Sequence, residues 1–389
     1  MSEIQRWTVN EPYLDIPGTL LEGPFHDVAN NEFRFVDIWE HKLYRLDLTK
    51  GPDSLKVIET DASVGVTANI GPRSNQLIVG AKHGFARLDH TTGKLSYIHD
   101  IHKLWGEDGG KAERMRFNDG AVDSHGRFWA GAMNDPKIKK PEAEGVLFRL
   151  DPDQSVHHML APVTIPNGIG WNLTDDVMYL TDSPTGKIFA FDFDASSGAI
   201  SNRRVHFDIG NALEPDGFAI DVEGCIWSAV YGGGKVLRIS PAGKIIGQID
   251  LPTRNVTCPA FVGTELFITT AKDDRDDDQL PQSVRYGGRV YRVDVGVRGV
   301  PKNEFRHLWI HGTWYKGYSY STWYFGRIHC SVYVHTSYRR RINGASLVLC
   351  ICRVKTRARG RPKAEGGSMI NKRASTPVRA VIVQKPGSG

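Results

Sequence analysis

Polar residues recur at regular intervals in the first part of this chain, in short turns that contain glycine. The turns are Glu22-Gly23-Pro24, Arg116-Phe117-Asn118-Asp119-Gly120, Pro166-Asn167-Gly168 and Pro215-Asp216-Gly217. Asn118 follows Glu22 by 96 residues, which is twice 48, and steps of 49 residues lead from Asn118 to Asn167 and on to Asp216. A single Asn-Gly or Asp-Gly dipeptide is an ordinary turn signal. The regular spacing, and the carboxylate or carboxamide in each turn, are what suggest a site.

The oxygen-rich side chains of these turns favour the binding of a metal ion. Glu22, Asn167 and Asp216 offer oxygen donors and carry two negative charges between them. Oxygen donors suit a hard divalent cation such as Ca²⁺, Mg²⁺ or Mn²⁺. Two carboxylates that face each other without a cation raise each other's pKa, and a bound cation removes that repulsion.

Other kinds of catalytic site find little support in the sequence. It contains no HExxH, GxSxG or P-loop motif and no CxxC pair, and its 14 histidines lack the spacing of metal ligands. The five cysteines are few and odd in number, which suggests free thiols in a reducing compartment. The N-terminus shows no secretory signal, and no apolar run approaches the ~20 residues of a membrane span. We therefore expect a cytoplasmic protein.

Six similar hairpins must position the polar turns. In each hairpin, apolar and polar residues alternate, and the apolar positions hold β-branched or aromatic residues. Hairpins repeated every 40–50 residues are typical of the blades of a β-propeller, which normally have four strands. We therefore predict an all-β fold, a six-bladed β-propeller, rather than a pair of β-sandwiches. Equivalent strand positions are Phe35, Ile78, Phe128, Tyr179, Trp227 and Phe267, at intervals of 43, 50, 51, 48 and 40 residues.

The ring architecture explains why the polar turns would act together. One end of each innermost strand opens on the central channel, so equivalent residues of successive blades converge on the axis. A strand near Arg6–Val9 or Thr19–Leu21 is expected to complete the last blade and close the ring. The propeller then needs nothing beyond about Phe305, and a short helix is expected only near Ile101–Trp105 or Gly109–Arg114.

Charge divides the chain near residue 306. Residues 307–389 contain 15 Lys and Arg but a single acid, Glu365, whereas residues 1–306 contain 34 basic and 43 acidic residues. The acidic body argues against nucleic acid as its partner. The tail mixes basic and aromatic residues without a period of 2 or 3.6. We expect it to be disordered, although such a mixture would also suit single-stranded nucleic acid, and a segment that is not a selected protein sequence would look the same.

The predicted organisation is thus a β-propeller domain with a candidate metal site over residues 1–306 and a basic, aromatic-rich tail over residues 307–389. A family resemblance is carried by four segments of the body: TLLEGPFHD (residues 19–27), RFNDGAVDSHGRFWAGAM (116–133), IPNGIGWNLTDDVMYLTDSPTGKIFAFDFD (165–194) and EPDGFAIDVEGCIWSAVYGGGKVLRISP (214–241). They resemble the senescence marker protein (regucalcin)/gluconolactonase/luciferin-regenerating-enzyme-like family, over about residues 15–300. The tail from His307 has no counterpart in that family.

The resemblance implies a propeller with one divalent cation at the channel mouth, Ca²⁺ first, with Zn²⁺, Mn²⁺ or Mg²⁺ as alternatives. Carried over residue by residue, it implies Glu22, Asn167 and Asp216 as metal ligands, and Arg116 and Asn118 as contacts to the substrate. It also implies metal-assisted opening of a lactone ring by water, with Asp216 as the general base. Arg116 and Asn118 would stabilise the developing negative charge. The protein would act as a monomer on a small lactone, without nucleic acid or membrane as a partner.

One departure from the family and two alternative functions stay open. Pro136 stands where sugar-lactone enzymes often carry a glutamate for the substrate hydroxyls, so the sugar specificity is open, and Asp135 is the candidate substitute. The same site would suit a hydrolase of phosphotriesters or aryl esters, because metal-activated water serves either class. A calcium-binding propeller without catalysis would keep the ion as a structural element, but it would not need Arg116 and Asn118.

Overall fold

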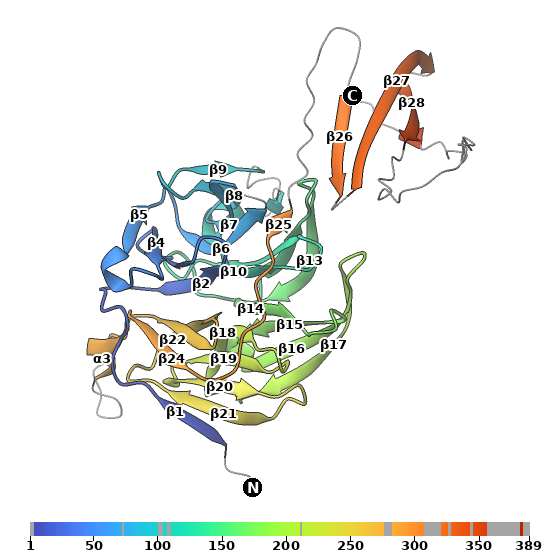
Figure 1. Ribbon diagram of the computed structural model, residues 1–389. Helices are drawn as coiled ribbons and strands as arrows, with labels where there is room; N and C mark the ends of the chain where they lie inside the picture. The colour runs from blue at the N-terminus through green and yellow to red at the C-terminus, as the bar shows by residue number, and fades with distance from the viewer. Residues whose placement is uncertain are drawn as a thin grey trace, which may run out of the picture. The chain divides into compact units, whose positions relative to one another are not determined.

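Six β-sheets follow one another around a central axis in the computed structural model of this protein, which confirms the six-bladed propeller (Figure 1). The chain divides into two units, residues 1–307, which contain the propeller, and residues 308–389. The structure describes residues 4–71, 74–99, 104–106, 110–210, 212–275 and 282–306, and the backbone of four strands between residues 320 and 383. The colours of Figure 1 run once around the ring, so the first and sixth blades are neighbours.

The strands of each blade follow one another in sequence from the channel outward, and neighbours pair antiparallel. The blades are β2 (Leu21–Asp27), β3 (Glu32–Asp37), β4 (Lys42–Asp47) and β5 (Lys56–Glu59); β6 (Val64–Gly71), β7 (Gln76–Ala81), β8 (Gly84–Asp89) and β9 (Leu95–Tyr97); β10 (Met115–Val122), β11 (Phe128–Asn134), β12 (Gly145–Leu150) and β13 (Val156–Val163); β14 (Pro166–Trp171), β15 (Val177–Asp182), β16 (Lys187–Asp194) and β17 (Ala199–Asp208); β18 (Glu214–Ile220), β19 (Ile226–Tyr231), β20 (Lys235–Ile239) and β21 (Ile245–Asp250); and β22 (Val256–Val262), β23 (Glu265–Thr270) and β24 (Val290–Asp294).

The predicted repeat corresponds to the second and third strands of each blade. All six residues that mark it lie on second strands and are buried, from Phe35 on β3 to Phe267 on β23. These side chains fill the layers between neighbouring blades. In one such layer the Phe85 ring lies 4.7 Å from that of Phe117, and the Phe148 ring lies 5.7 Å from Phe117. Packed rings of this kind bury large apolar areas, so the blades hold one another in place.

Of the two segments predicted to close the ring, Thr19–Leu21 does reach the sixth blade, where Leu20 bridges Ala271 after β23, but the strand near Arg6–Val9 does not. β1 (Gln5–Thr8) does not complete the last blade but runs parallel to β21 of the fifth blade. Trp7 of β1 packs on Trp227, with ring centroids 5.3 Å apart, and this apolar contact stabilises the pairing of β1 with the fifth blade. In the sixth blade, the outer edge of β24 is bridged by Leu14, which pairs with Val290. The N-terminal segment therefore crosses two blades before it enters the first.

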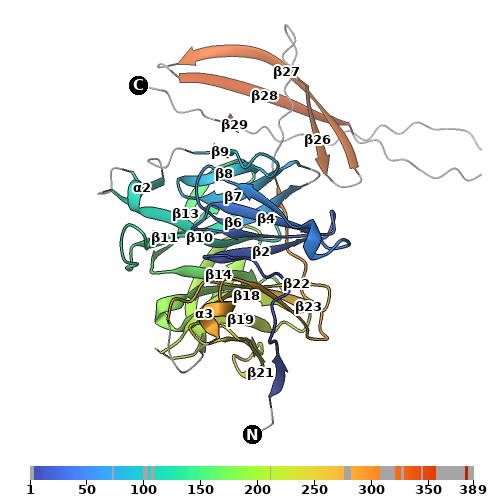
Figure 2. The ribbon, with the colours of Figure 1, turned by 90° about the vertical axis from the view of Figure 1, so that its left-hand side faces the viewer.

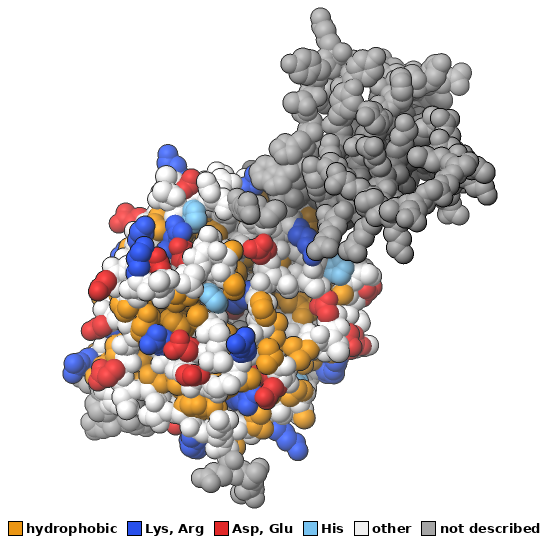
Figure 3. Space-filling view, viewed as in Figure 1, with side chains coloured by type: hydrophobic (Ala, Val, Ile, Leu, Met, Phe, Trp, Pro, Cys, Tyr) orange, Lys and Arg blue, Asp and Glu red, His pale blue; other side chains and the backbone are white. Residues whose placement is uncertain are grey.

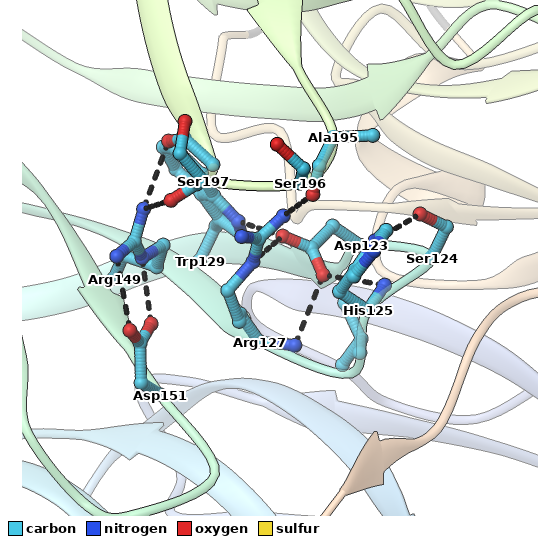
Figure 4. A network of polar contacts seen from close by, with 12 residues as sticks. Asp123, Ser124, His125, Arg127, Trp129, Arg149, Asp151, Ala195, Ser196 and Ser197 are labelled. Atoms are coloured by element: carbon cyan, nitrogen blue, oxygen red, sulfur yellow. Dashed lines mark hydrogen bonds and ion pairs between the residues drawn. The ribbon is translucent and has the colours of Figure 1, made fainter. Parts of the chain in front are cut away.

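An aspartate–tryptophan contact fixes the turn after the inner strand in two blades. After β10, Asp123 accepts hydrogen bonds from the backbone N–H of Arg127 and from the indole Nε1 of Trp129 (2.9 Å). After β18, Asp221 accepts in the same way from Trp227 Nε1 (2.9 Å). Figure 4 shows the Asp123 group and its link through Arg127 to the carbonyl oxygen of Ala195 in the next blade. The buried carboxylate is paired, as buried charges must be.

A strap formed by residues 297–306 crosses the end of the channel and binds several blades. The backbone of Val222 donates to the carbonyl oxygen of Arg298, and Lys302 Nζ donates to that of Pro24 (2.8 Å). The strap ends in β25 (Phe305–Arg306), which pairs parallel with β6. Its path lies across the front of Figure 1, and Figure 2 shows it along the edge of the propeller opposite α2 (Lys111–Arg114).

Helical segments are short in the part of the chain that the structure describes. α2 falls within the second range predicted for a helix, whereas α3 (Ser283–Tyr286) and the 3₁₀ turns η1 (Pro52–Ser54) and η2 (Ser183–Thr185) were not predicted. None of the helices among the described residues is long and apolar enough to span a membrane.

The second unit contains one antiparallel sheet. It is formed by β26 (Tyr320–Phe325), β27 (Ile328–Ile342), β28 (Ala345–Lys355) and β29 (Ile382–Val383). These strands differ from the disordered tail that the sequence favoured over residues 307–389. The other residues of that segment lie outside the described residues, so for them disorder stays a prediction.

We expect a chain that ends at His307 to keep the thermal unfolding transition of the propeller, because all blades and the strap are present. A chain that ends at Pro301 should be much less stable, since it lacks Phe305, which is fully buried among residues of the second and third blades. Phe305→Ala alone is expected to cost ~3–5 kcal/mol. Thermal melts followed by circular dichroism check all three chains. Loss of the transition in the chain that ends at His307 would contradict this prediction.

Candidate metal and active site

The predicted site residues lie at an irregularity of four inner strands. The pairing of each inner strand with the second strand shifts at this point: between Glu22 and Phe25 on β2, Phe117 and Gly120 on β10, Asn167 and Ile169 on β14, and Pro215 and Phe218 on β18. A β-bulge bends a strand and re-aims its side chains. The recurrent glycine-containing turns of the sequence are therefore the bulges of successive blades.

Glycine lets the inner strands approach one another at the bulges. A Cβ atom on Gly217 would lie 2.4 Å from Sγ of Cys258 on the next inner strand, and one on Gly168 would lie 2.3 Å from the Phe218 ring. Neither distance is compatible with a side chain. The polar residue that precedes each glycine, Asn167 or Asp216, is thereby held beside the neighbouring blade.

Arg116, Asn118 and Asn167 form a buried chain of hydrogen bonds across two blades. Arg116 Nη1 donates to Asn118 Oδ1 (2.7 Å), and Asn118 Nδ2 donates to Asn167 Oδ1 (2.8 Å). Asn167 Nδ2 donates in turn to Oγ of Ser183 (2.8 Å). The buried Nε of Arg116 has no hydrogen-bond partner among the described residues. The structure therefore brings the two predicted substrate contacts next to a predicted metal ligand, with one guanidinium N–H still to be satisfied.

Three buried carboxyl groups lie close enough to perturb one another. Glu22, Asp119 and Asp216 are 5%, 7% and 5% exposed. Burial raises the pKa of Glu22 to about 8, and the charge of Asp119 adds to the effect. Burial, and then the charges of Glu22 and Asp119, raise the pKa of Asp216 well above its ordinary value. Burial also raises the pKa of Asp119. All three shifts mean that the positive charges of the chain compensate these carboxylates only in part.

These residues fit a divalent cation. Oδ1 of Asp216 is buried and has no hydrogen-bond partner among the described residues, although buried carboxylate oxygens are normally paired. A cation beside Glu22 and Asp216 would satisfy this oxygen and lower the pKa of both carboxyls. Asn167 Oδ1 adds a neutral oxygen donor, so the donor set is the one that hard cations prefer.

Comparison with known proteins identifies the family to which this fold belongs. A family model described as "SMP-30/Gluconolactonase/LRE-like region" matches residues 20–272. The chain belongs to this family. Regucalcin of Bos taurus is 33% identical over 289 residues, which cover 72% of this chain and 92% of the relative. The resemblance inferred from the sequence motifs is therefore confirmed.

Two solved structures show the same propeller. A luciferin-regenerating enzyme aligns with a TM-score of 0.67 at 26% identity, over 74% of this chain and 96% of its own. A calcium-binding protein, regucalcin from Agrobacterium tumefaciens, aligns with a TM-score of 0.69 at 24% identity, over 78% of this chain and 99% of its own. At 24% identity, the likeness to the Agrobacterium tumefaciens regucalcin supports the fold alone.

Three residues near the site of this SMP-30/gluconolactonase/LRE-like protein were not assigned to it from the sequence. Asp119 joins the carboxyl cluster, Ser183 orients Asn167, and Lys302 of the strap lowers the pKa of Glu22 by its charge. Asp119 had a local signal, because it adjoins Asn118 in the same turn. Ser183 had none, since only the register of β14 and β15 places it beside Asn167, and Lys302 had none, since it reaches the site through the packing of a distant segment.

Asp135 is not a free substitute for the missing glutamate. Its carboxylate accepts hydrogen bonds from Lys82 Nζ (2.9 Å) and from the backbone N–H of Lys137 (3.1 Å). Burial alone would raise its pKa, but these contacts hold the pKa of Asp135 below its ordinary value. Asp135 is therefore a weak base that is already paired, and Pro136 next to it offers no polar side chain.

A second group of potential metal ligands is already neutralised. Asp221, Glu223 and Cys225 lie close together after β18. Arg238 Nη2 lies 2.7 Å from the carboxylate of Asp221 and 2.7 Å from that of Glu223. Because the Arg238 guanidinium already contacts both carboxylates, this group is a structural ion-pair cluster rather than the predicted site.

We expect the cation-free protein to lose stability as the pH rises from about 5 to 8. With a pKa of about 8, folded Glu22 keeps a proton that the unfolded chain releases at its ordinary pKa. The free energy of unfolding therefore falls as the pH rises across this window. Glu22→Gln, which cannot titrate, should reduce this slope. Urea unfolding at several pH values measures this slope, once in chelator and once with added Ca²⁺ in place of the chelator. Identical pH slopes for the variant and the wild type would contradict the assignment of the shift to Glu22.

Proposed function

We propose that this protein is a divalent-metal-dependent hydrolase that opens lactone rings. The observation that carries the proposal is the unpaired, buried Oδ1 of Asp216 within a cluster of three carboxyls, next to the Arg116–Asn118–Asn167 chain. A structural ion would need the carboxyls but not a buried guanidinium with a free N–H beside them. The family description, which includes gluconolactonase, supports the choice of a lactone.

Different residues of the chain would bind the cation and transfer the proton. Glu22, Asn167 and Asp216 would hold the cation, Ca²⁺ by the character of the donors. When bound, the cation would supply a Lewis acid for the ester carbonyl. Ser183 and Asn118 fix the amide of Asn167 from both sides, so its Oδ1 is oriented before any ligand arrives.

Asp216 is suited to accept a proton from the attacking water. Its Oδ1, which has no hydrogen bond among the described residues, would face the cation, and its second carboxylate oxygen would accept the proton. A carboxyl must be ionised to act as a base, and a neighbouring positive charge favours the ionised form. Arg116 Nε would donate to the ester oxygen as negative charge develops there. Both N–H groups of the Asn118 amide are already bonded to Pro166 O and Asn167 Oδ1, so Asn118 would act by orienting Arg116 and Asn167. Burial of the Arg116 donor strengthens its interaction, because little water competes.

The substrate is expected to be a small lactone with few hydroxyl groups. Pro136 provides no acceptor for sugar hydroxyls, and Asp135 is committed to Lys82. A panel of polyhydroxylated lactones, aliphatic lactones, aryl esters and phosphotriesters, each with and without chelator, tests this proposal. Chelator-sensitive turnover of an aliphatic lactone supports it. Calcium binding without turnover of any lactone would favour a calcium-binding protein instead, and turnover of phosphotriesters alone would move the activity to that class.

Asp216→Asn should separate cation binding from catalysis. The amide keeps an oxygen donor but cannot accept a proton at neutral pH, so lactone hydrolysis at saturating cation should fall ~10²–10⁴-fold. Asn167→Ala is the matched control, because it should weaken cation binding and be partly rescued by more cation. Rates against cation concentration for both variants check this. If Asp216→Asn reaches nearly the wild-type rate at saturation, Asp216 is only a ligand and Asp119 becomes the next candidate base.

A further inference from the structure

The half of the channel that lies beyond the carboxyl cluster forms a second cavity. It has a volume of about 680 Å³ and is lined by residues of all six inner strands and of the strap. The lining includes Gly23 and Asp119 beside the carboxyl cluster, and Val300 and Lys302 of the strap. Small-molecule sites typically enclose ~300–1,000 Å³, so the cavity has the size of a ligand site.

The wall of this cavity is mainly apolar, and its mouth is apolar as well. Three aromatic rings, those of Phe25, Phe218 and Phe261, contribute to the wall. Four large hydrophobic residues that line the cavity are exposed to solvent: Val28 (67%), Leu173 (54%), Val222 (51%) and Val300 (39%). Hydrophobic side chains are open to solvent on the face of the propeller that the strap crosses (Figure 3). Exposed aliphatic residues gathered around a cavity indicate a binding surface rather than scattered surface residues.

Lys302 gives the cavity a cationic group. Its Nζ donates to the Pro24 carbonyl oxygen and lies 5.6 Å from the centroid of the Phe25 ring. An ammonium has three N–H donors, and this is the one hydrogen bond that Lys302 makes among the described residues. Arg298 adds a second cation to the lining.

The acidic residues of the lining are less available. Asp175 accepts a hydrogen bond from Oγ of Ser124, and Asp119 belongs to the carboxyl cluster. An apolar wall with an accessible ammonium is complementary to a molecule that carries a hydrocarbon body and one negative charge.

We propose that this cavity binds an amphiphilic monocarboxylate of medium chain length, with its carboxylate on Lys302 and its hydrocarbon chain against the apolar wall and mouth. This inference goes beyond the proposed lactonase activity, but the two sites adjoin the same carboxyl cluster, because Asp119 lines the cavity and the charge of Lys302 reaches Glu22. It would allow the protein to bind a second, chemically different ligand through the other end of the channel.

Decanoate is the probe for this site. We expect it to displace the fluorescent anion 8-anilinonaphthalene-1-sulfonate from the full-length protein with a saturable curve. Lys302→Met should weaken decanoate binding about tenfold, the usual value of one charge-assisted hydrogen bond. Decyltrimethylammonium has the same chain length and the opposite charge, and it should not compete at the same concentrations.

Two valine substitutions provide the matched control. Val222→Glu places a negative charge at the mouth, whereas Val205→Glu places it on β17 at the outside of the fourth blade, and the two valines are 51% and 52% exposed. We expect at least a tenfold loss of decanoate affinity in the first variant and none in the second, with similar melting temperatures. Absence of saturable displacement, equal binding of the cationic analogue, or equal affinities of the two valine variants would overturn the proposal.

Discussion

The burial of several carboxyl groups at the channel is the constraint on which the rest of this structure depends. Glu22, Asp119 and Asp216 are almost fully buried, and the chain supplies too little positive charge to compensate them. Such groups must either keep their protons or share a cation. The bulged inner strands, with glycine at the points of closest approach, are what hold the three groups together against this cost.

The closure of the ring is what makes that arrangement rigid. β1 joins the fifth blade, Leu14 bridges the sixth, and the strap ties the end of the body to the first, second, third and fifth blades. No single contact of this kind is large, but together they fix both ends of the body to blades that are distant in sequence. These contacts hold the blades that carry the convergent side chains.

The two halves of the channel differ in chemistry because the inner strands differ along their length. The bulge of each strand carries polar residues, and the residues that follow it are mostly apolar, as in the run from Phe218 to Ile220. The strap covers the apolar half and places Lys302 within it. The same segment that stabilises the fold through Phe305 therefore also shapes the second cavity.

Much of this structure follows from local sequence, because strand alternation and turn chemistry depend on neighbouring residues. The hairpin repeat predicted six blades, and the spacing from Glu22 to Asp216 predicted which side chains share the axis. The sequence placed Asp119 in the same turn as Asn118, but the entry of its side chain into the carboxyl cluster did not follow, since adjacent residues of a regular strand point to opposite faces and only the bulge between Phe117 and Gly120 changes this. The partner of β1, the burial of Phe305 and the approach of Lys302 did not follow either. Each of these depends on pairing between segments more than 200 residues apart, and packing of the whole ring, rather than local propensity, decides such pairings.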